Sequence, residues 1–320
     1  MAVKLGFVGT GGIANHHMRT IAQIDHAKMV AFCDVVPEKA AAAASTYGGE
    51  AFNNFVEMYD NAQLDAVYIC VPPFAHGGQE LAALERGLPI FVEKPVAATA
   101  EKAREILAAI EEKGAISGVG YHWRYMDTTE QALSLVGDQP VGFALGTWAG
   151  GMPGVSWWRV MEESGGQIVE QTTHIFDLAR YLLGEVTSVH GFARTGLMAD
   201  VENYSVHDAT VTNLTFASGA IASITSACML SAGSKVGLDL YLKDQVLRLN
   251  SGSLTIEKSD DQQTVELGNN PTLAEDSAFI DAVASGDASP IRSDYAEAVK
   301  TLELTLAATR SCIEGTVVEL

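Results

Sequence analysis

The sequence of 320 residues contains no long apolar run and few basic residues. No stretch reaches about 18 consecutive apolar residues, so we expect no membrane span. Met1–Lys4 leads directly into a strand-like segment without the charged and apolar regions of a signal peptide, and none is expected. Lys and Arg total 20 against 40 Asp and Glu, which gives a net charge of −20. Because such a surface repels phosphate backbones, nucleic-acid binding is not expected.

Cysteine is also scarce. The four cysteines are Cys33, Cys70, Cys228 and Cys312, and no two of them form a C-x-x-C pair. The first two lie in apolar strand-like runs, which is typical of buried, reduced thiols. This usage predicts a cytoplasmic protein without a cysteine metal site.

What the sequence does contain is enough apolar material for packed cores, at 48% apolar and 8% aromatic residues. At about 150 residues per domain, the length predicts two domains. Residues 1–121 alternate short apolar runs with helical segments. The runs at 3–9, 29–34, 65–71, 88–92 and 115–119 are expected strands, and 50–52 is expected as a further, brief strand. Strands that are apolar throughout indicate a parallel sheet covered on both faces, so 1–121 is expected to be a doubly wound α/β domain.

Residues 122–320 have a different pattern. Helices are expected at 126–136 and within 165–183, and alternating strand patterns occupy most of 186–267. Ala217-Ser218-Gly219 separates two of these strands, as a hairpin requires. Two further helices, 272–284 and 294–312, precede a short final strand. The order predicts an α+β domain with a mostly antiparallel sheet.

A glycine-rich segment follows the first expected strand. It consists of Gly9, Thr10, Gly11, Gly12, Ile13 and Ala14, a G-x-G-x-x-A pattern between a strand and a helix. Gly9 permits the tight turn, Gly11 lets a pyrophosphate approach the backbone, and Ala14 lets the helix pack on the strand. Twenty positions later, Asp34 can accept hydrogen bonds from a ribose and would repel a 2′-phosphate. The pattern predicts a dinucleotide site that favours NAD over NADP.

Glu93-Lys94-Pro95 closes the expected strand at 88–92. In an open parallel sheet, ligands lie beyond the carboxyl ends of the strands, so Glu93 and Lys94 are expected beside the cofactor. The segment after the strand at 65–71 ends at the same edge and adds three expected cofactor-binding residues, Val71, Pro72 and His76. An ordinary exposed lysine is the alternative interpretation of Lys94 on these residues alone.

Glu170 and His174 are four residues apart in an expected helix, which would place them on one face. Histidine ionises near neutral pH and suits a base that removes a hydroxyl proton while a hydride leaves the same carbon. Lys94 could also act as this base, but we favour His174, with Lys94 orienting the hydroxyl and Glu170 assisting. A surface ion pair or a metal-ligand pair are the alternatives, and the second lacks a third ligand at a convincing spacing. Asp177 and Arg180 are expected to pair along the same helix.

Aromatic residues gather at 121–125 and at 148–158. Because sugar rings present apolar C–H faces that pack on aromatic planes, a carbohydrate or cyclic polyol substrate is consistent with them. Packing inside the protein is the alternative for each. The expected substrate-binding residues are Lys94, Tyr121, Arg124, Trp157, Trp158, Glu170 and His174.

Four motifs occur in a fixed order: GTGGIA at 9–14, CVPPFAH at 70–76, FVEKP at 91–95 and GGQIVEQTTHIFDLARYLLG at 165–184. Over essentially its whole length, the chain resembles the Gfo/Idh/MocA oxidoreductase family. The resemblance implies an N-terminal Rossmann domain and a C-terminal domain with an open, mostly antiparallel sheet through which homodimers or homotetramers form. It also implies that Lys94 contributes to catalysis and that His174 is the general acid/base.

The chain departs from the family at one motif, since it has E-Q-T-T-H where D-x-G-x-H is common. The role of Glu170 is therefore less firmly implied than that of His174. Our leading hypothesis is an NAD-dependent dehydrogenase for a sugar, sugar derivative or polyol. One alternative is an eliminase- or glycosidase-type enzyme that retains NAD without net redox. Another is a regulator that binds a dinucleotide or sugar without catalysis.

Overall fold

The computed structural model describes residues 2–320, which form two compact units. The first unit comprises residues up to His122 together with 270–299, and the second comprises 123–269 and 300–320. The sequence-based boundary at 121–122 assigned 270–299 to the second domain. These residues belong instead to the first unit, where α10 (Pro271–Ser285) packs on α1 (Gly12–Ile21) and β1 (Val3–Val8).

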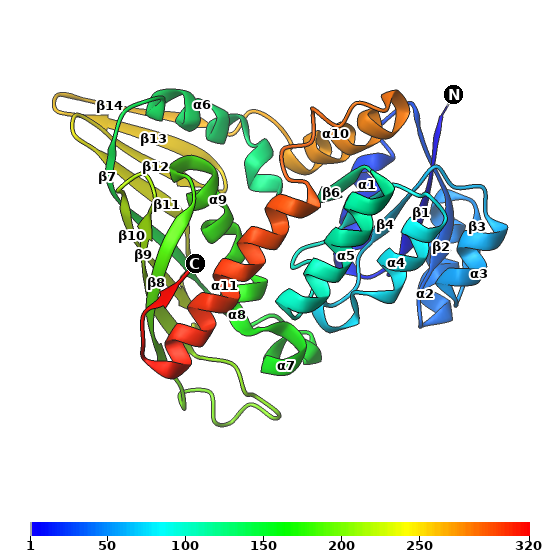
Figure 1. Cartoon of the computed structure of the whole chain (residues 1–320), viewed down its shortest axis with the longest axis horizontal. Coiled ribbons are helices and arrows are strands. Elements are labelled where there is room, and N and C mark those ends of the chain that lie inside the picture. Colours follow the sequence, from blue (N-terminus) through cyan, green and yellow to red (C-terminus); the bar gives the residue numbers. More distant parts are fainter. Residues whose placement is uncertain (1) are drawn as a thin grey trace. The chain divides into compact units, whose positions relative to one another are not determined.

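The first unit contains a six-stranded parallel sheet with the order β3-β2-β1-β4-β5-β6 (Figure 1). Its other strands are β2 (Ala27–Cys33), β3 (Glu50–Phe52), β4 (Ala66–Ile69), β5 (Ile90–Val92) and β6 (Ser117–Val119). Its other helices are α2 (Pro37–Tyr47), α3 (Phe55–Asn61), α4 (Gly78–Glu85) and α5 (Ala100–Lys113), of which α3 was not predicted. The doubly wound α/β prediction is confirmed.

Aromatic side chains form the centre of the first unit's core. The Tyr68 ring stacks on Phe7 and Phe91, with centroids 4.9 and 4.6 Å apart. Phe279 of α10 meets both Tyr68 and Phe91 edge-on at 5.5 Å. A segment from near the end of the chain therefore completes the core of the N-terminal domain.

The second unit contains a nine-stranded sheet with the order β14-β13-β12-β11-β7-β10-β9-β8-β15. Its strands are β7 (Val141–Ala149), β8 (Val186–Arg194), β9 (Ala209–Phe216), β10 (Ile221–Ala227), β11 (Lys235–Leu242), β12 (Val246–Asn250), β13 (Ser253–Lys258), β14 (Asp261–Glu266) and β15 (Val318–Glu319). β7 was not predicted as a strand, and its pairing with β10 is parallel. The other pairs are antiparallel, which confirms a mostly antiparallel sheet.

Helices α6 (Asp127–Val136) and α9 (Thr173–Leu183) pack along one face of this sheet (Figure 1). The segment from 165 to 183 is not one helix, because α8 (Gly166–Glu170) ends before α9 begins. The N–H of Thr172 bonds to the carbonyl of Gln167, five residues back, which interrupts the helical hydrogen-bond series. The shorter elements are α7 (Met161–Ser164) and the 3₁₀ turns η1 (Pro73–Ala75), η2 (His122–Tyr125) and η3 (Ser156–Arg159). The long helix α11 (Tyr295–Glu314) precedes the final strand, β15.

None of the helices formed by residues 2–320 combines the length and the apolar character needed to cross a membrane.

Candidate active-site groups in the two units

The glycine loop lies between β1 and α1, where the sheet order reverses between β1 and β4. Gly9 has a φ of 81°, and a Cβ there would lie 2.3 Å from the carbonyl oxygen of Cys70, so only glycine fits. At Gly11 and Gly12, by contrast, a Cβ would meet nothing within 4 Å. Gly11 is the N-cap of α1 and places no side-chain cap on its free N–H groups. Open space over an uncapped helix N-terminus suits the pyrophosphate of a dinucleotide.

Asp34 follows β2 and organises the same loop. Its Oδ2 accepts hydrogen bonds from the backbone N–H and the hydroxyl of Thr10 at 2.9 and 3.0 Å, and its Oδ1 accepts from the Val36 N–H at 2.9 Å. A carboxylate has about four acceptor sites, so at least one remains for a ribose hydroxyl. Ala14 is fully buried where α1 packs, whereas Ile13 is 44% exposed.

The segment after β4 holds His76 in one orientation. His76 Nδ1 lies 2.6 Å from Oε1 of Glu80, whose Oε2 accepts the N–H of Gly77 at 2.7 Å. Because Nδ1 faces a carboxylate it donates, which leaves Nε2 of a neutral ring as an acceptor. This Nε2 is buried and has no hydrogen-bond partner within the described chain, as a group awaiting a ligand would be. Val71 and Pro72, half-buried, line the same segment.

Lys94 follows β5, at the same carboxyl edge as the glycine loop. It is half-buried, and its backbone N–H donates to Oε2 of Glu93 at 3.1 Å. Glu93 is only 5% exposed. Tyr121, after β6, is 1% exposed, so its ring is closed off from solvent.

Glu170 and His174 flank the break between α8 and α9 in the second unit. Because the helix is interrupted, the two residues do not share one face of a continuous helix as the sequence predicts. Two indoles hold them instead. The Nε1–H of Trp158 donates to Oε2 of Glu170 at 2.7 Å, and the ring of Trp148 stacks on the His174 imidazole at 5.6 Å with an interplanar angle of 21°. Within residues 2–320 no group of three or more His, Cys, Asp or Glu side chains is placed to hold a metal ion.

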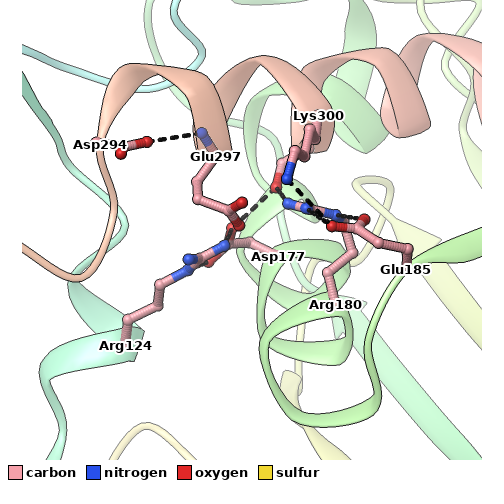
Figure 2. A network of polar contacts seen from close by, with 8 residues as sticks. Arg124, Asp177, Arg180, Glu185, Asp294, Glu297 and Lys300 are labelled. Carbon is pink, nitrogen blue, oxygen red and sulfur yellow. Dashed lines mark hydrogen bonds and ion pairs between the residues drawn. The ribbon is translucent and has the colours of Figure 1, made fainter.

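Arg124 lies in the interior of the second unit, 2% exposed. Its guanidinium donates two hydrogen bonds to Asp177, at 2.8 and 2.7 Å (Figure 2). The hydroxyl of Thr301 donates to Asp177 and accepts from Arg180, so a threonine stands between the two residues expected to pair. Arg180 also donates to both oxygens of Glu185. This network fixes α9, which carries His174, and it gives Arg124 a buried partner in place of the expected substrate.

Trp157 and Trp158 differ in exposure. Trp158 is 1% exposed and packs in a small cluster with Val206 and Cys228, whereas Trp157 is half-buried at the margin of that cluster. Of the two, only Trp157 presents ring surface to the outside of the unit.

Sequence reasoning missed one buried residue of the first unit, His17. It lies on α1 with Ala14, Met18 and Ile21, all of them buried. That spacing of three, four and seven residues marks one helix face and would have placed His17 toward the core.

Comparison with known proteins gives matches to both units. The family profile described as "Oxidoreductase family, NAD-binding Rossmann fold" matches residues 3–121, and the "GFO/IDH/MocA C-terminal domain" matches 143–248. The chain is 29% identical over 232 residues to a scyllo-inositol 2-dehydrogenase (NAD(+)) of Bacillus subtilis, which covers 70% of this chain and 67% of that protein.

Solved structures agree in fold. A putative myo-inositol dehydrogenase from Sinorhizobium meliloti superposes with a TM-score of 0.84 at 26% identity, over 99% of each chain. A levoglucosan dehydrogenase in complex with NADH and levoglucosan superposes with a TM-score of 0.91 at 20% identity, over 100% of this chain and 99% of the other.

Proposed function

Because the chain belongs to the Gfo/Idh/MocA family of NAD-binding oxidoreductases, we propose that it transfers a hydride between NAD and a secondary alcohol of a sugar, sugar derivative or cyclic polyol. The observation that carries the proposal is the carboxyl edge of the six-stranded sheet, where the open glycine loop follows β1, Asp34 follows β2 and Lys94 follows β5. The relatives support the substrate class, since inositols and levoglucosan carry secondary alcohols on a ring.

The residues of the first unit fit NAD. Gly11 and Gly12 leave room at the N-terminus of α1, and Asp34 keeps an acceptor for the ribose. Bound NAD would supply the acceptor for the hydride that leaves the carbinol carbon. The residues proposed to hold NAD are Gly9, Thr10, Gly11, Gly12, Ile13, Ala14, Asp34, Val71, Pro72, His76, Glu93 and Lys94.

Oxidation of an alcohol also releases the hydroxyl proton, and we assign it to His174. Stacking on Trp148 fixes the plane of the His174 imidazole. We assign to Lys94 the orientation of the reacting hydroxyl. Glu170, held by the Trp158 N–H, accepts a hydrogen bond from a neighbouring substrate hydroxyl. Loss of the C–H hydride and the O–H proton leaves a ketone.

The test is a panel of inositols, sugars and anhydrosugars mixed with the protein and NAD, followed by the absorbance of reduced nicotinamide. Lys94→Ala and His174→Asn should each lower kcat about 10²-fold or more, with the Kd for NAD changed less than about threefold. Lys39→Ala, an exposed lysine on α2, is the matched control and should leave kcat unchanged. Equal losses of NAD binding and turnover in the Lys94 and His174 variants would contradict the assigned roles.

The purified protein could hold NAD and yet show no reduced nicotinamide with any compound of the panel. Mass spectrometry of the panel mixtures would then look for sugar products that form without net reduction of NAD. If such products form with the native chain and not with Lys94→Ala, the protein is an enzyme that retains NAD without net redox, and the proposal of net dehydrogenation is rejected.

We also infer that the chain forms a homodimer or homotetramer through the open face of the nine-stranded sheet. This face exposes large apolar side chains around a hollow of about 420 Å³ lined by β7, β8, β9 and β10. They include Phe143, Leu145, Phe192, Val211 and Ile221. Light scattering should show an oligomer for the native chain and a monomer for Ile221→Glu, and a monomeric native chain would refute the inference.

A further inference from the structure

A buried histidine joins three elements of the first unit. His17 on α1 places Nε2 2.8 Å from Oε1 of Glu93, at the end of β5, and Nδ1 2.8 Å from Oδ1 of Asp276, on α10. The side chains of His17 and Asp276 are no more than 1% exposed, and that of Glu93 is 7% exposed. These residues are far apart in the sequence and meet only in the folded unit.

The geometry fixes the charge of His17. A neutral imidazole has one N–H, but here both ring nitrogens face carboxylate oxygens, so both donate and the ring is an imidazolium. Burial alone would lower the pKa of His17, but Asp276 and Glu93 together raise it well above its ordinary value. Burial alone would likewise raise the pKa of Glu93, and the hydrogen bond and charge of His17 hold it below its usual range. The cation and the two carboxylates therefore stabilise one another.

Every group in this cluster is held on more than one side. Asp276 Oδ2 accepts the hydroxyl of Thr20 at 2.5 Å. The rings of Tyr68 and Phe91 pack against the His17 imidazole at 5.6 and 5.1 Å. These contacts hold the imidazole to which the Glu93 carboxylate bonds.

The cluster ends at Lys94. One oxygen of Glu93 accepts from His17, and the other accepts the backbone N–H of Lys94 at 3.1 Å. A carboxylate that is fixed by a buried cation thus fixes the backbone from which the Lys94 side chain extends. Both ring nitrogens of His17 bond to carboxylates, those of Glu93 and Asp276, and the rings of Tyr68 and Phe91 pack around the imidazole.

We propose that His17 and Asp276 are positioning residues for Lys94, acting through Glu93. The proposal rests on the function assigned to Lys94 above. It means that α10, which follows β14 in the sequence, contributes to the placement of the lysine that follows β5. A purely structural role for the cluster predicts something different: its loss would lower stability but leave the reactivity of Lys94 in the folded protein unchanged.

The decisive variant is Asp276→Asn, with Glu275→Gln as its matched control. Both replace a buried carboxyl group on α10 by its amide, but only Asp276 bonds to His17. Asp276→Asn should lower kcat by about tenfold to a hundredfold, as expected for a displaced reacting group, while KM and the Kd for NAD change less than about threefold. Glu275→Gln should leave kcat within about twofold.

A second measurement does not depend on turnover. Competitive labelling with acetic anhydride and mass spectrometry give the reactivity of Lys94 relative to exposed Lys39 in the same molecule. Glu93→Gln and Asp276→Asn should both change this ratio, and Glu275→Gln should not. A changed ratio in a protein that shows no dehydrogenase activity would retain the positioning inference and reject the proposed function.

A milder variant covers the case in which Asp276→Asn fails to fold. Thr20→Val keeps the shape and all three charges but removes the hydroxyl that bonds to Asp276, and it should change the labelling ratio in the same direction by a smaller factor. Variants that lose thermal stability but keep the native labelling ratio and the native kcat would overturn the proposal.

Discussion

Gly120 lies so close to the Glu93 carboxylate that a single methyl group there should disturb the buried cluster. A Cβ at this position would lie 2.3 Å from Oε1 of Glu93 and 2.8 Å from its carboxyl carbon. Ordinary contact begins near 3.4 Å, so in Gly120→Ala the carboxylate must move back by about 1 Å. His17 bonds to the same oxygen at 2.8 Å, and that shift takes the two atoms beyond hydrogen-bond range.

The cost follows from the charges involved. A lost hydrogen bond to a charged group costs about 1.5–3 kcal/mol, and breaking a buried ion pair about 3–5 kcal/mol. We therefore expect the free energy of unfolding of Gly120→Ala to fall by about 2–4 kcal/mol. Because Glu93 also holds the backbone of Lys94, kcat should fall about tenfold or more while NAD affinity is retained.

Urea unfolding followed by circular dichroism measures the first effect, and steady-state kinetics measures the second. Gly78→Ala is the control, since a Cβ at the start of α4 would meet only Phe55 at an ordinary 3.7 Å. If Gly120→Ala matches Gly78→Ala in both stability and kcat, then Glu93 is free to move and the reasoning about its fixed position is refuted.

Three further outcomes follow from the contacts described. Trp158→Phe removes the N–H donor from Glu170 and should lower kcat/KM for the alcohol about tenfold with NAD affinity unchanged, and equal losses of both would contradict this. Burial raises the pKa of Glu275 well above its ordinary value, so folding takes up a proton and stability is lost as pH rises above about 4.5. In urea unfolding at several pH values, the stability of Glu275→Gln relative to the native chain should therefore increase with pH. Asp34→Ala should lower the ratio of kcat/KM for NAD to that for NADP, since the carboxylate no longer repels a 2′-phosphate.

The parts of the fold that the sequence predicts are those fixed by local pattern. The apolar run of β4 is buried at all four positions, and Thr99 caps α5 by accepting from the Lys102 N–H, as its place before an alanine-rich segment predicts. The glycine loop belongs to the same class, because the turn, the helix start and Asp34 all lie within one β-α-β unit. An NAD-binding Rossmann domain could therefore be predicted from this segment, in agreement with the family match over residues 3–121.

The parts that the sequence does not predict depend on distant residues. β7 has no clean alternation, and its place in the sheet depends on parallel pairing with β10. β10 begins at Ile221, 72 positions after β7 ends at Ala149. The segment 270–299 returns to the first unit through contacts with α1, and no local pattern marks that return. The break between α8 and α9 is likewise invisible, because Gln171 and Thr172 are compatible with a continuous helix.

The charges of the histidines around Glu93 also depend on the folded environment and could not be predicted from local sequence. His17 and His122 both interact with the charge of this carboxylate, yet they differ in charge. His17 has two carboxylates and is a cation, whereas burial lowers the pKa of His122 to about 4, with Lys94 and His17 adding to the effect. Neither histidine therefore changes its charge near neutral pH. A protonation step of the reaction near neutral pH requires another group, and this supports the assignment of that step to His174 over the histidines beside Lys94.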